Sequence, residues 1–499
     1  MCFTDASSVG LIDELSAKHI PTNTEHREAK FNAMTNGSTP EMIRLASTTE
    51  DQFESYDRRR FKAAVALTCL WGCTALLHLL AWGQWVVYGL TVLTGAHLFR
   101  LLLAKPEPMP EPLPSWQERS VTEDRSDVSG WPQVSILIAA KNEVAVIGAL
   151  TDSLMELDYP SQRYDVWIIN DNSTDGTAVI LDRLARRYPN LHVVHRDHTA
   201  TGGKSGALNQ AWRQAQGSLF VVFDADAQIA PDCLRRVVPI FDTPNVGAVQ
   251  MRKAIANGSQ NFWTHGQVAE MAFDAYCQLK RVARGGLGEL RGNGQFVRRA
   301  ALEQCGGWTE ETITDDLDLT FKLHLTGWDI PLVMLPSVRE EGVVKAISLW
   351  HQRNRWAEGG YQRYLDYWRL LTPKRLGWMK TTDLFIFCLM QYLLPTAAIP
   401  DFALALARNR MPVLWPLSSV VLLFSSLGMA NGLWRTRKTS LFTVLGQTLR
   451  GMAYMMHWFV VMGTVTLRMA IRPKRLKWVK TQHSGLDDPP IVEATISSQ

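Results

Sequence analysis

Two carboxylates follow directly after an apolar run near the middle of the chain. Residues 219–223 read Leu-Phe-Val-Val-Phe, and Asp224 and Asp226 come next with only Ala225 between them. The run predicts a buried parallel strand, and two carboxylates at its end are too costly to leave without partners. A divalent cation such as Mg²⁺ or Mn²⁺ would offset that cost and could neutralise a diphosphate leaving group. The simpler alternative is an acidic turn in which Asp232 caps the next helix.

A glycine-rich segment with one lysine precedes a predicted helix. Residues 201–206 read Thr-Gly-Gly-Lys-Ser-Gly. Backbone N–H groups can approach an anion closely there, and Lys204 adds positive charge. The spacing differs from that of a Walker A loop. A flexible turn with an incidental lysine is the alternative.

Three acids crowd together before another apolar helical pattern. Asp315, Asp316 and Asp318 precede or begin the pattern that continues with Leu319 and Phe321. They could simply be N-terminal charges that the helix dipole favours. Alternatively, one of them is a general base whose neighbours tune its pKa.

A fourth cluster combines a glutamine, an arginine and a tryptophan. Residues 350–356 read Trp-His-Gln-Arg-Asn-Arg-Trp, so Gln352 and Arg355 share one face of a helix. An arginine there can bind a phosphate through two N–H groups, and Trp356 offers a flat face to a sugar. The alternative is an ordinary interfacial helix with aromatic and basic residues.

The elements that must position these residues alternate between strand and helix over residues 131–375. Strands are predicted at 134–140, 166–170, 192–195, 219–223 and 246–251, and helices at 145–157, 177–187 and 204–214. This pattern predicts an α/β domain with a doubly wound, mostly parallel sheet. Lys141, Asp171 and the pair Asp224 and Asp226 each follow or end a strand. They should therefore meet at the edge where such sheets bind ligands.

Composition limits the other possibilities. The 499 residues carry a net charge of +4, and no basic block interleaved with aromatic residues indicates nucleic-acid binding. Seven cysteines without CxxC spacing argue against a disulfide framework or a zinc site.

Apolar stretches near both ends predict membrane segments. We expect a disordered polar tail at 1–57, a transmembrane hairpin at 58–104 and a stiff proline-rich linker at 105–130. Its two helices would be Ala63–Trp82 and Trp85–Leu103, and basic residues on both outer sides place the hairpin's ends in the cytoplasm.

The C-terminal part, residues 376–470, holds three more apolar candidates, at 384–407, 413–434 and 441–467, before a basic cytoplasmic tail at 471–499. Three crossings would leave that tail outside. Because Pro395, Pro400 and Asp401 interrupt the first candidate, we expect it to be bent, re-entrant or interfacial, which gives four crossings in all, with five as the alternative. The run from Tyr361 to Arg375 suits either a helix on the bilayer surface or a packed helix.

Four of these motifs, taken in order, resemble the D, DxD, (E/D)D, QxxRW signature of the membrane-embedded family 2 glycosyltransferases. They are Asp171, the pair Asp224 and Asp226, the run Thr314-Asp315-Asp316 and the run 352–356. Asn170 stands where a first Asp is common, and Asp315 stands where Glu is common. The resemblance implies a GT-A-like fold and an inverting reaction. It also implies roles for nine residues. Asp171 and Lys204 would lie on the nucleotide side, and Asp224 and Asp226 would bind Mg²⁺ or Mn²⁺, with Asp224 also beside the nucleotide sugar. Asp316 would be the general base beside Asp315, and Gln352, Arg355 and Trp356 would close over the donor and acceptor.

A closer resemblance covers most of the chain beyond the tail. The stretches ATGGKSGALNQ, GELRGNGQFVRR, EETITDDLDLTF and LWHQRNRWAEGGYQRYLDYW are similar to the cyanobacterial branch that glucosylates diacylglycerol. That resemblance implies UDP-glucose as donor and diacylglycerol in the bilayer as acceptor, with a product that precedes the galactolipids of photosynthetic membranes. It also implies a multi-pass protein of the plasma or thylakoid membrane with a cytoplasmic catalytic domain. The alternative is a processive polysaccharide synthase of the cellulose, hyaluronan or poly-N-acetylglucosamine type.

Overall fold

The computed structural model describes residues 49–118, 128–437 and 440–472, and the side chains from residue 59 onward within these ranges. Most of the expected tail, part of the expected linker and nearly all of the basic C-terminal segment therefore lie outside the described residues. The first described helix, α3 (Thr49–Leu79), begins nine residues before the point where the hairpin was expected to start.

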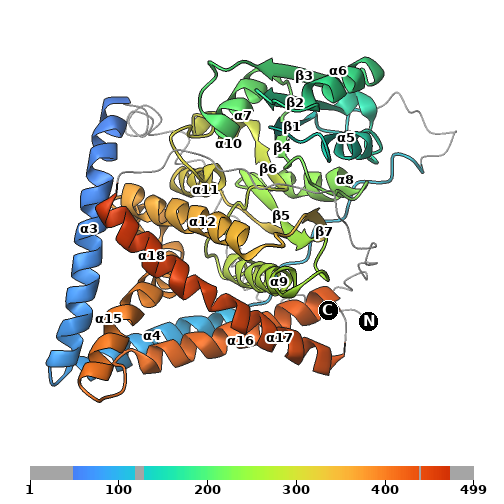
Figure 1. Ribbon diagram of the computed structural model, residues 1–499. Coiled ribbons are helices and arrows are strands. Elements are labelled where there is room, and N and C mark those ends of the chain that lie inside the picture. Colours follow the sequence, from blue (N-terminus) through green and yellow to red (C-terminus); the bar gives the residue numbers. More distant parts are fainter. Residues whose placement is uncertain (1–48, 119–127, 438–439, 473–499) are drawn as a thin grey trace, which may run out of the picture. The chain divides into compact units, whose positions relative to one another are not determined.

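The centre of the fold is a seven-stranded sheet with the order β3-β2-β1-β4-β6-β5-β7 (Figure 1). Its strands are β1 (Val134–Ala140), β2 (Tyr164–Asp171), β3 (Leu191–Arg196), β4 (Leu219–Val222), β5 (Ala248–Ile255), β6 (Gln295–Arg298) and β7 (Leu332–Glu340). The neighbouring pairs are parallel except those of β6, which is antiparallel to both β4 and β5. The predicted α/β class with a mostly parallel sheet is confirmed.

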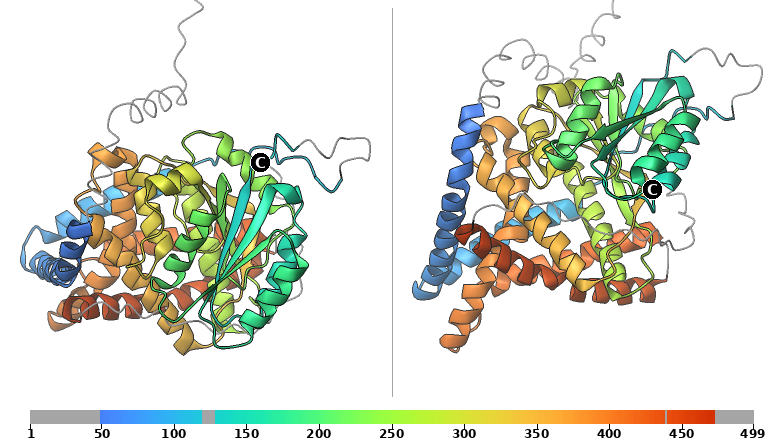
Figure 2. Two further views of the ribbon diagram at one scale, coloured as in Figure 1. Left: turned by 90° about the horizontal axis from the view of Figure 1, so that it is seen from above. Right: turned by 45° about the horizontal axis from the view of Figure 1, so that its top comes forward.

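Short 3-10 turns at Ser161–Arg163 and Val238–Asp242 and a set of helices connect the strands. The helices of this region are α5 (Ile147–Met155), α6 (Thr177–Arg187), α7 (Gly203–Gln214), α8 (Cys233–Val237), α9 (Phe262–Val282), α10 (Arg299–Gln304), α11 (Asp315–Leu325), α12 (Ala346–Tyr367) and α13 (Pro373–Leu376). Helices α5 and α6 lie together along one face of the sheet (Figure 2), and α7 packs against β1 and β2.

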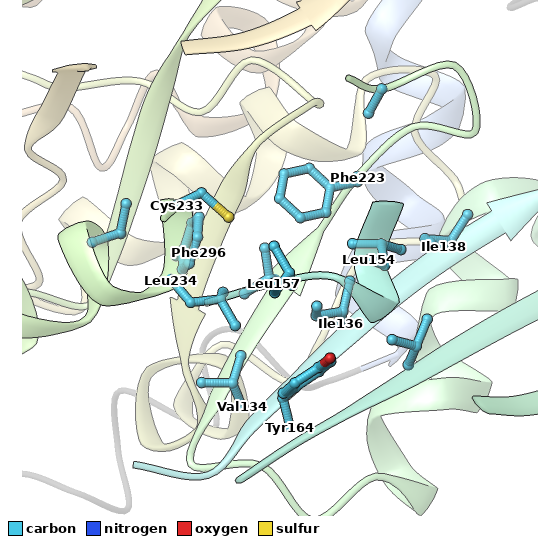
Figure 3. Packing of buried hydrophobic residues seen from close by; sticks show 14 of the residues in the cluster. Val134, Ile136, Ile138, Leu154, Leu157, Tyr164, Phe223, Cys233, Leu234 and Phe296 are labelled. Carbon is cyan, nitrogen blue, oxygen red and sulfur yellow. The ribbon is translucent and has the colours of Figure 1, made fainter. Parts of the chain in front are cut away.

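Alternate residues of the strands form the main core. Ile136 and Ile138 of β1 point to the face covered by α5, where Leu154 is fully buried (Figure 3). Phe223, just after β4, packs edge-on against Phe296 of β6 with ring centroids 6.4 Å apart. This packing fixes the register of the strands, and with it the position of each strand's end. A shift by one residue would turn the apolar side chains of a strand away from the core.

The register brings the ends of the strands together. Ala140 pairs with Asn170, and Leu137 pairs with Val222. The residues that follow these positions, Lys141, Asp171 and Asp224, consequently lie at one edge of the sheet, as the sequence predicted.

Four described helices are long and apolar enough to cross a bilayer. They are Arg59–Leu79 within α3, α4 (Gly83–Leu102), the run Trp378–Ala407 and α16 (Trp415–Arg437). The run Trp378–Ala407 consists of α14 (Trp378–Cys388), a π-helical segment η3 (Leu389–Leu393) and α15 (Leu394–Ala407). Inside it, Asp401 binds His78 of α3 at 2.7 Å and accepts the backbone N–H groups of Val413 and Leu414.

Five apolar candidates and four crossings were expected from the sequence. The described residues contain four helices long and apolar enough to cross, and these include the run Trp378–Ala407 but not the segment 441–467. The prediction that residues 441–467 form one crossing helix is wrong. This part of the chain forms two helices, α17 (Leu441–Met455) and α18 (His457–Ile471), of 15 residues each. A crossing helix needs about 20 residues, so neither is long enough. The stretch around Pro395 and Pro400, which was expected to be bent, re-entrant or interfacial, belongs to a helical run of 30 residues that a π-helical segment interrupts.

The run Tyr361–Arg375 is largely a packed element, which decides between its two interpretations. Tyr361 and Arg363 are buried in α12, with relative exposures of 6% and 1%. Helix α12 packs against α11 and α18. Its far end is joined to α3 by Arg59, which donates two hydrogen bonds to Asp366 at 2.6 and 2.7 Å.

Candidate active site

A cavity of about 600 Å³ lies at the edge where β1, β2 and β4 end. The nine site residues predicted from the sequence all line it: Asp171, Lys204, Asp224, Asp226, Asp315, Asp316, Gln352, Arg355 and Trp356. They come from strand ends, from the first turns of α7 and α11, and from the middle of α12. The fold therefore brings together four clusters that are up to 185 residues apart in sequence.

Asp171, at the end of β2, is held by two basic side chains. Arg196 Nη1 lies 2.7 Å from Asp171 Oδ1, and Lys141 Nζ lies 3.8 Å from Oδ2. The neighbouring Asn170 turns away and its amide contacts His195 Nδ1 at 2.9 Å. Asp171 lines the cavity, whereas Asn170 is not among the lining residues.

Lys204, in the first turn of α7, forms an ion pair across the cavity with Asp224. The distance from Lys204 Nζ to Asp224 Oδ1 is 2.5 Å. Burial lowers the pKa of the Lys204 ammonium, but the carboxylates of Asp224, Asp315 and Asp316 more than offset this and raise it. The lysine is therefore positively charged at neutral pH.

The turn before α7 depends on a glycine. Gly202 has a φ of +79°, and a Cβ there would lie 2.3 Å from the carboxylate of Glu310. The backbone conformation requires glycine at this position, and a Cβ would in addition displace the Glu310 carboxylate. The same turn is held from β3 by Arg196, which donates to the carbonyl oxygens of Gly203, at 2.9 Å, and Thr201.

Asp224 and Asp226 present carboxylates to the cavity in a way that suits a hard cation. Asp226 Oδ2 accepts the N–H of Glu341 at 3.0 Å, and the N–H of Asp224 donates to Asn293 Oδ1 at 3.2 Å. Within the described ranges no three His, Cys, Asp or Glu side chains group together as a metal site. A cation at this pair would consequently complete its shell with waters or with oxygens of a ligand. Asp232, the alternative cap, stands before α8 but pairs with Arg236 instead of capping.

The charge of the cavity lining supports the same fit. Eleven carboxylates face six basic side chains. The carboxylates belong to Glu143, Asp171, Asp224, Asp226, Glu270, Asp274, Glu289, Asp315, Asp316, Glu340 and Glu341. The basic residues are Lys141, Lys204, Lys253, Arg291, Arg355 and Arg363. An anionic diphosphate would enter this cavity at a high electrostatic cost unless a divalent cation accompanied it.

Asp316 is the second residue of α11, in its acidic first turn, and its pKa is raised. Burial, followed by the neighbouring charge of Asp315, raises the pKa of Asp316 to about 6. A carboxyl with a pKa near the working pH is suited to accept a proton. Gly292, with a φ of +82°, lies beside it: a Cβ there would be 3.5 Å from Asp316 Oδ2. Within the described residues, Asp315 Oδ2 is buried without a hydrogen-bond partner.

Asp318 has a different environment from Asp316. Arg363 Nη1 donates to Asp318 Oδ1 at 2.6 Å, and the Tyr367 hydroxyl donates to the same oxygen at 3.0 Å. Although burial raises the pKa of Asp318, these partners and Lys322 lower it overall. This carboxylate joins α11 to α12, and it does not line the cavity.

The motif residues of α12 project toward the acids from the opposite wall. Burial lowers the pKa of Arg355, and the nearby carboxylates of Asp224, Asp316 and Asp315 oppose that shift. The Trp356 ring lies between two cations, with Arg353 Cζ 4.1 Å and Lys253 Nζ 5.5 Å from its centroid. Gln352 accepts a hydrogen bond from Arg353 at 2.9 Å.

Two buried ionic groups around the site were not predicted from the sequence. In the first, Glu270 of α9 accepts hydrogen bonds from Arg353, from the Tyr454 hydroxyl at 3.0 Å and from Trp458 Nε1 at 2.8 Å. It ties α12 to α17 and α18. In the sequence, the only indication of this buried group is that Arg353 lies inside the aromatic and basic motif at 350–356.

The second buried group supports the loop beside Asp316. Arg291 binds Asp274 at 2.7 Å and Glu289 at 2.6 Å, and Arg281 binds Glu289 at 2.8 Å and Asp383 at 2.9 Å. The chain of charges runs from the loop at 284–294 to α14. The sequence does not reveal the group as a whole, because its members come from α9, from the loop at 284–294 and from α14.

The cavity also has an apolar end. Phe387, Gln391 and Tyr392 of the run Trp378–Ala407 line it, as do Trp458 and Met462 of α18. The same cavity thus joins the acids at the sheet edge to side chains of a candidate membrane helix.

Comparisons with known proteins agree with this geometry. Residues 132–359 match the family model "Glycosyltransferase like family 2". A beta-monoglucosyldiacylglycerol synthase from Nostoc sp. is 54% identical over 437 residues, which cover 86% of this chain and 90% of that protein. The beta-monoglucosyldiacylglycerol synthase of Synechocystis sp. is 54% identical over 442 residues, or 87% of this chain and 90% of that protein.

A solved structure shares the fold. It is a mannosyltransferase from Pyrobaculum calidifontis in complex with GDP-Man and Mn²⁺, with a TM-score of 0.50, 22% identity, and coverage of 80% of this chain and 99% of that one. The protein is therefore a GT-A-like glycosyltransferase of the family 2 type, and the chain belongs to the family of the beta-monoglucosyldiacylglycerol synthases.

Proposed function

We propose that the protein transfers glucose from UDP-glucose to the free hydroxyl of 1,2-diacylglycerol with inversion, giving β-monoglucosyldiacylglycerol. The observation that carries the proposal is the single cavity that joins Asp224, Asp226 and Asp316 to the apolar side chains of α14, η3 and α18. A water-soluble donor and a lipid acceptor can reach one another only in such a space. The relatives named above support the choice of glucose and diacylglycerol.

The donor would lie on the nucleotide side of the cavity. Asp171, which Arg196 holds, would contact the uridine, and Lys204, which pairs with Asp224, would lie beside the diphosphate. Asp224 and Asp226 would hold Mg²⁺ or Mn²⁺, which supplies positive charge to the diphosphate as it leaves. Gln352, Arg355 and Trp356 close over the donor and the incoming hydroxyl from α12.

Transfer is a single displacement. Asp316 accepts the proton of the lipid hydroxyl while the hydroxyl oxygen forms a bond to the anomeric carbon of glucose. The bond from that carbon to the diphosphate breaks, and UDP leaves with the electron pair. Because attack comes from the side opposite the leaving group, an α-linked donor gives a β-glucoside. Arg355 faces the same acids from α12 and stabilises the phosphate charge that develops.

The acceptor dictates a membrane location, and two features of the helices support one. The four candidate spans carry exposed apolar side chains, among them Leu79, Trp85 and Leu423. Helix α17 exposes Phe442, Leu445 and Leu449 on one face and buries its other face, as a helix in the bilayer surface does.

Four crossings place both ends of the described chain on the side of the catalytic domain. The positive-inside tendency makes this the cytoplasmic side, because Arg59, Arg60 and Arg472 flank the outermost helices. The protein is then a multi-pass component of the plasma or thylakoid membrane of a cyanobacterium.

The test is a transfer assay in vesicles with and without diacylglycerol, using labelled UDP-glucose, UDP-galactose and UDP-N-acetylglucosamine in parallel. We expect label in the organic phase only with UDP-glucose and only when diacylglycerol is present. Label in a water-soluble or insoluble polymer, independent of diacylglycerol, would contradict the proposal and favour a polysaccharide synthase.

A further inference from the structure

A π-helical segment interrupts the candidate membrane helix Trp378–Ala407 beside the cavity. In η3 the N–H of Leu394 donates to the carbonyl oxygen of Leu389, five residues back. Pro395 follows directly, and it has no N–H with which to bond the Gln391 carbonyl in the α-helical pattern. The proline thus accounts for the change of register at this point of the helix.

The register change determines which side chains face the cavity. A π turn inserts one extra residue into the helical repeat and so rotates the side chains that follow it. Here Gln391 and Tyr392 both line the cavity, together with Phe387 one turn earlier. Single π turns inside α-helices are frequent at functional sites for this reason.

Gln391 lines the cavity beside aromatic and apolar side chains. Its neighbours in the lining at this end are Phe387, Tyr392, Trp458 and Met462. Within the described part of the chain, no hydrogen bond joins the Gln391 side chain to another residue. A polar side chain that faces a cavity from a membrane helix is a candidate for a functional role.

The indole N–H at this end of the cavity is already engaged. Trp458 Nε1 donates to Glu270 at 2.8 Å. The Tyr392 hydroxyl lies against Gly360, where a Cβ would be 1.9 Å from the phenol oxygen. The ionised carboxylates of the lining can only accept hydrogen bonds. The Gln391 amide, with two N–H groups, is available as a donor to a ligand in the cavity.

We infer that Gln391 donates a hydrogen bond to an ester carbonyl of the diacylglycerol acceptor and thereby helps to select an acyl lipid. The inference rests on the proposed function. When the acceptor hydroxyl is at Asp316, the next polar groups along the lipid are its two esters, which only accept hydrogen bonds. They point toward the apolar end of the cavity, where Gln391 lies.

The experiment compares diacylglycerol with a dialkylglycerol, which has ether links and no carbonyl, in vesicles with saturating UDP-glucose. Wild-type protein should prefer the ester lipid by about three- to tenfold in kcat/KM, the size of one hydrogen bond. Gln391→Leu and the isosteric Gln391→Glu should raise KM for diacylglycerol by that factor and abolish the preference. KM for UDP-glucose should not change.

Phe385→Leu is the matched control, because Phe385 lies on the same helix with 54% of its side chain exposed, and it should keep the wild-type preference. An equal loss with both lipids in Gln391→Leu would assign the residue a structural role and overturn the inference. A wild-type preference that survives the substitution would also overturn it. Failure of the wild-type protein to glucosylate either lipid would overturn the proposed function itself, and the inference with it.

Discussion

Gly360 and Tyr392 are in such close contact that a Cβ at position 360 would lie 1.9 Å from the Tyr392 hydroxyl oxygen. Gly360 belongs to α12, which carries the Gln352, Arg355 and Trp356 motif, and Tyr392 belongs to η3 of a candidate membrane helix. Gly359 meets Thr314, the residue before Asp315, in the same way, with a Cβ distance of 2.3 Å. The two glycines therefore set the position of the motif helix against both the acidic turn and the membrane helix.

A side chain at position 360 should displace these elements. Gly360→Ala introduces a methyl group that overlaps the Tyr392 oxygen, and such overpacking costs about 1–3 kcal/mol. We expect a lower unfolding temperature and at least a tenfold lower transfer rate. Tyr392→Phe removes the oxygen, so the double variant should recover most of both losses.

Gly446→Ala provides the control for the glycine substitution itself, since nothing lies within 4 Å of a Cβ at that position of α17. It should leave stability unchanged or slightly increased, because alanine is the better helix former. A Gly360→Ala protein with normal activity would show that the contact with Tyr392 does not position α12.

The raised pKa of Asp316 predicts a pH profile. A general base with a pKa of about 6 is largely ionised above pH 7 and is protonated below pH 6. The transfer rate should therefore fall about tenfold for each pH unit below 6 and level off above 7. Measuring kcat at saturating UDP-glucose from pH 5 to 8 tests this.

Substitutions should distinguish the role of Asp316 from that of Asp318. Asp316→Asn should retain UDP-glucose binding and lose transfer by at least a hundredfold, because an amide cannot accept the proton. Asp318→Asn breaks the buried contact with Arg363 instead and should mainly lower the unfolding temperature. Near-normal turnover by Asp316→Asn would assign the base to another group.

Activity should depend on a divalent cation. Excess chelator should abolish transfer, and added Mg²⁺ or Mn²⁺ should restore it, since Asp224 and Asp226 face a cavity with an excess of carboxylates. Asp226→Asn should raise the cation concentration needed for half-maximal activity. The control is Asp232→Asn, because Asp232 pairs with Arg236 outside the cavity and should not affect that concentration. Full activity in chelator would contradict the prediction.

The buried pair Glu270 and Arg353 should behave as a unit. Removing one partner, as in Glu270→Leu or Arg353→Met, leaves a buried charge without its counter-ion, which costs about 3–5 kcal/mol. Replacing both should cost much less. Denaturation in mild detergent measures the difference, with the exposed pair Arg187 and Asp152 as control. Additive losses in the double variant would show that the two residues do not form a stabilising pair.

The sequence was sufficient to predict strands β1 to β5 and the residues at their ends, but not β6 or β7. Strand β1 and helix α6 have the predicted bounds, since regular apolar patterns mark both. Motif residues at strand ends could be assigned to one edge because parallel strands end together. Strand β6, with four residues and an antiparallel direction, was not predicted, because its short run lacks the alternation that distinguishes a strand.

The membrane-side elements were harder to predict for a related reason. The apolar composition of residues 441–467 indicates a crossing, yet the helix ends at Met455 and a second begins at His457. Contacts made by Glu270 with Tyr454 and Trp458 hold these two helices against α9, and such long-range contacts leave no periodic signal. Gln391 was not predicted for a similar reason, because its direction follows from the π turn before Pro395.

The most direct test of the account is the chemical identity of the product made from UDP-glucose in vesicles that contain diacylglycerol. We predict a lipid with a single glucose per molecule, and proton NMR should show a β-anomeric configuration. An α-linked glucolipid would contradict the single displacement at Asp316, and a lipid or polymer bearing many glucose units would contradict transfer to one diacylglycerol hydroxyl.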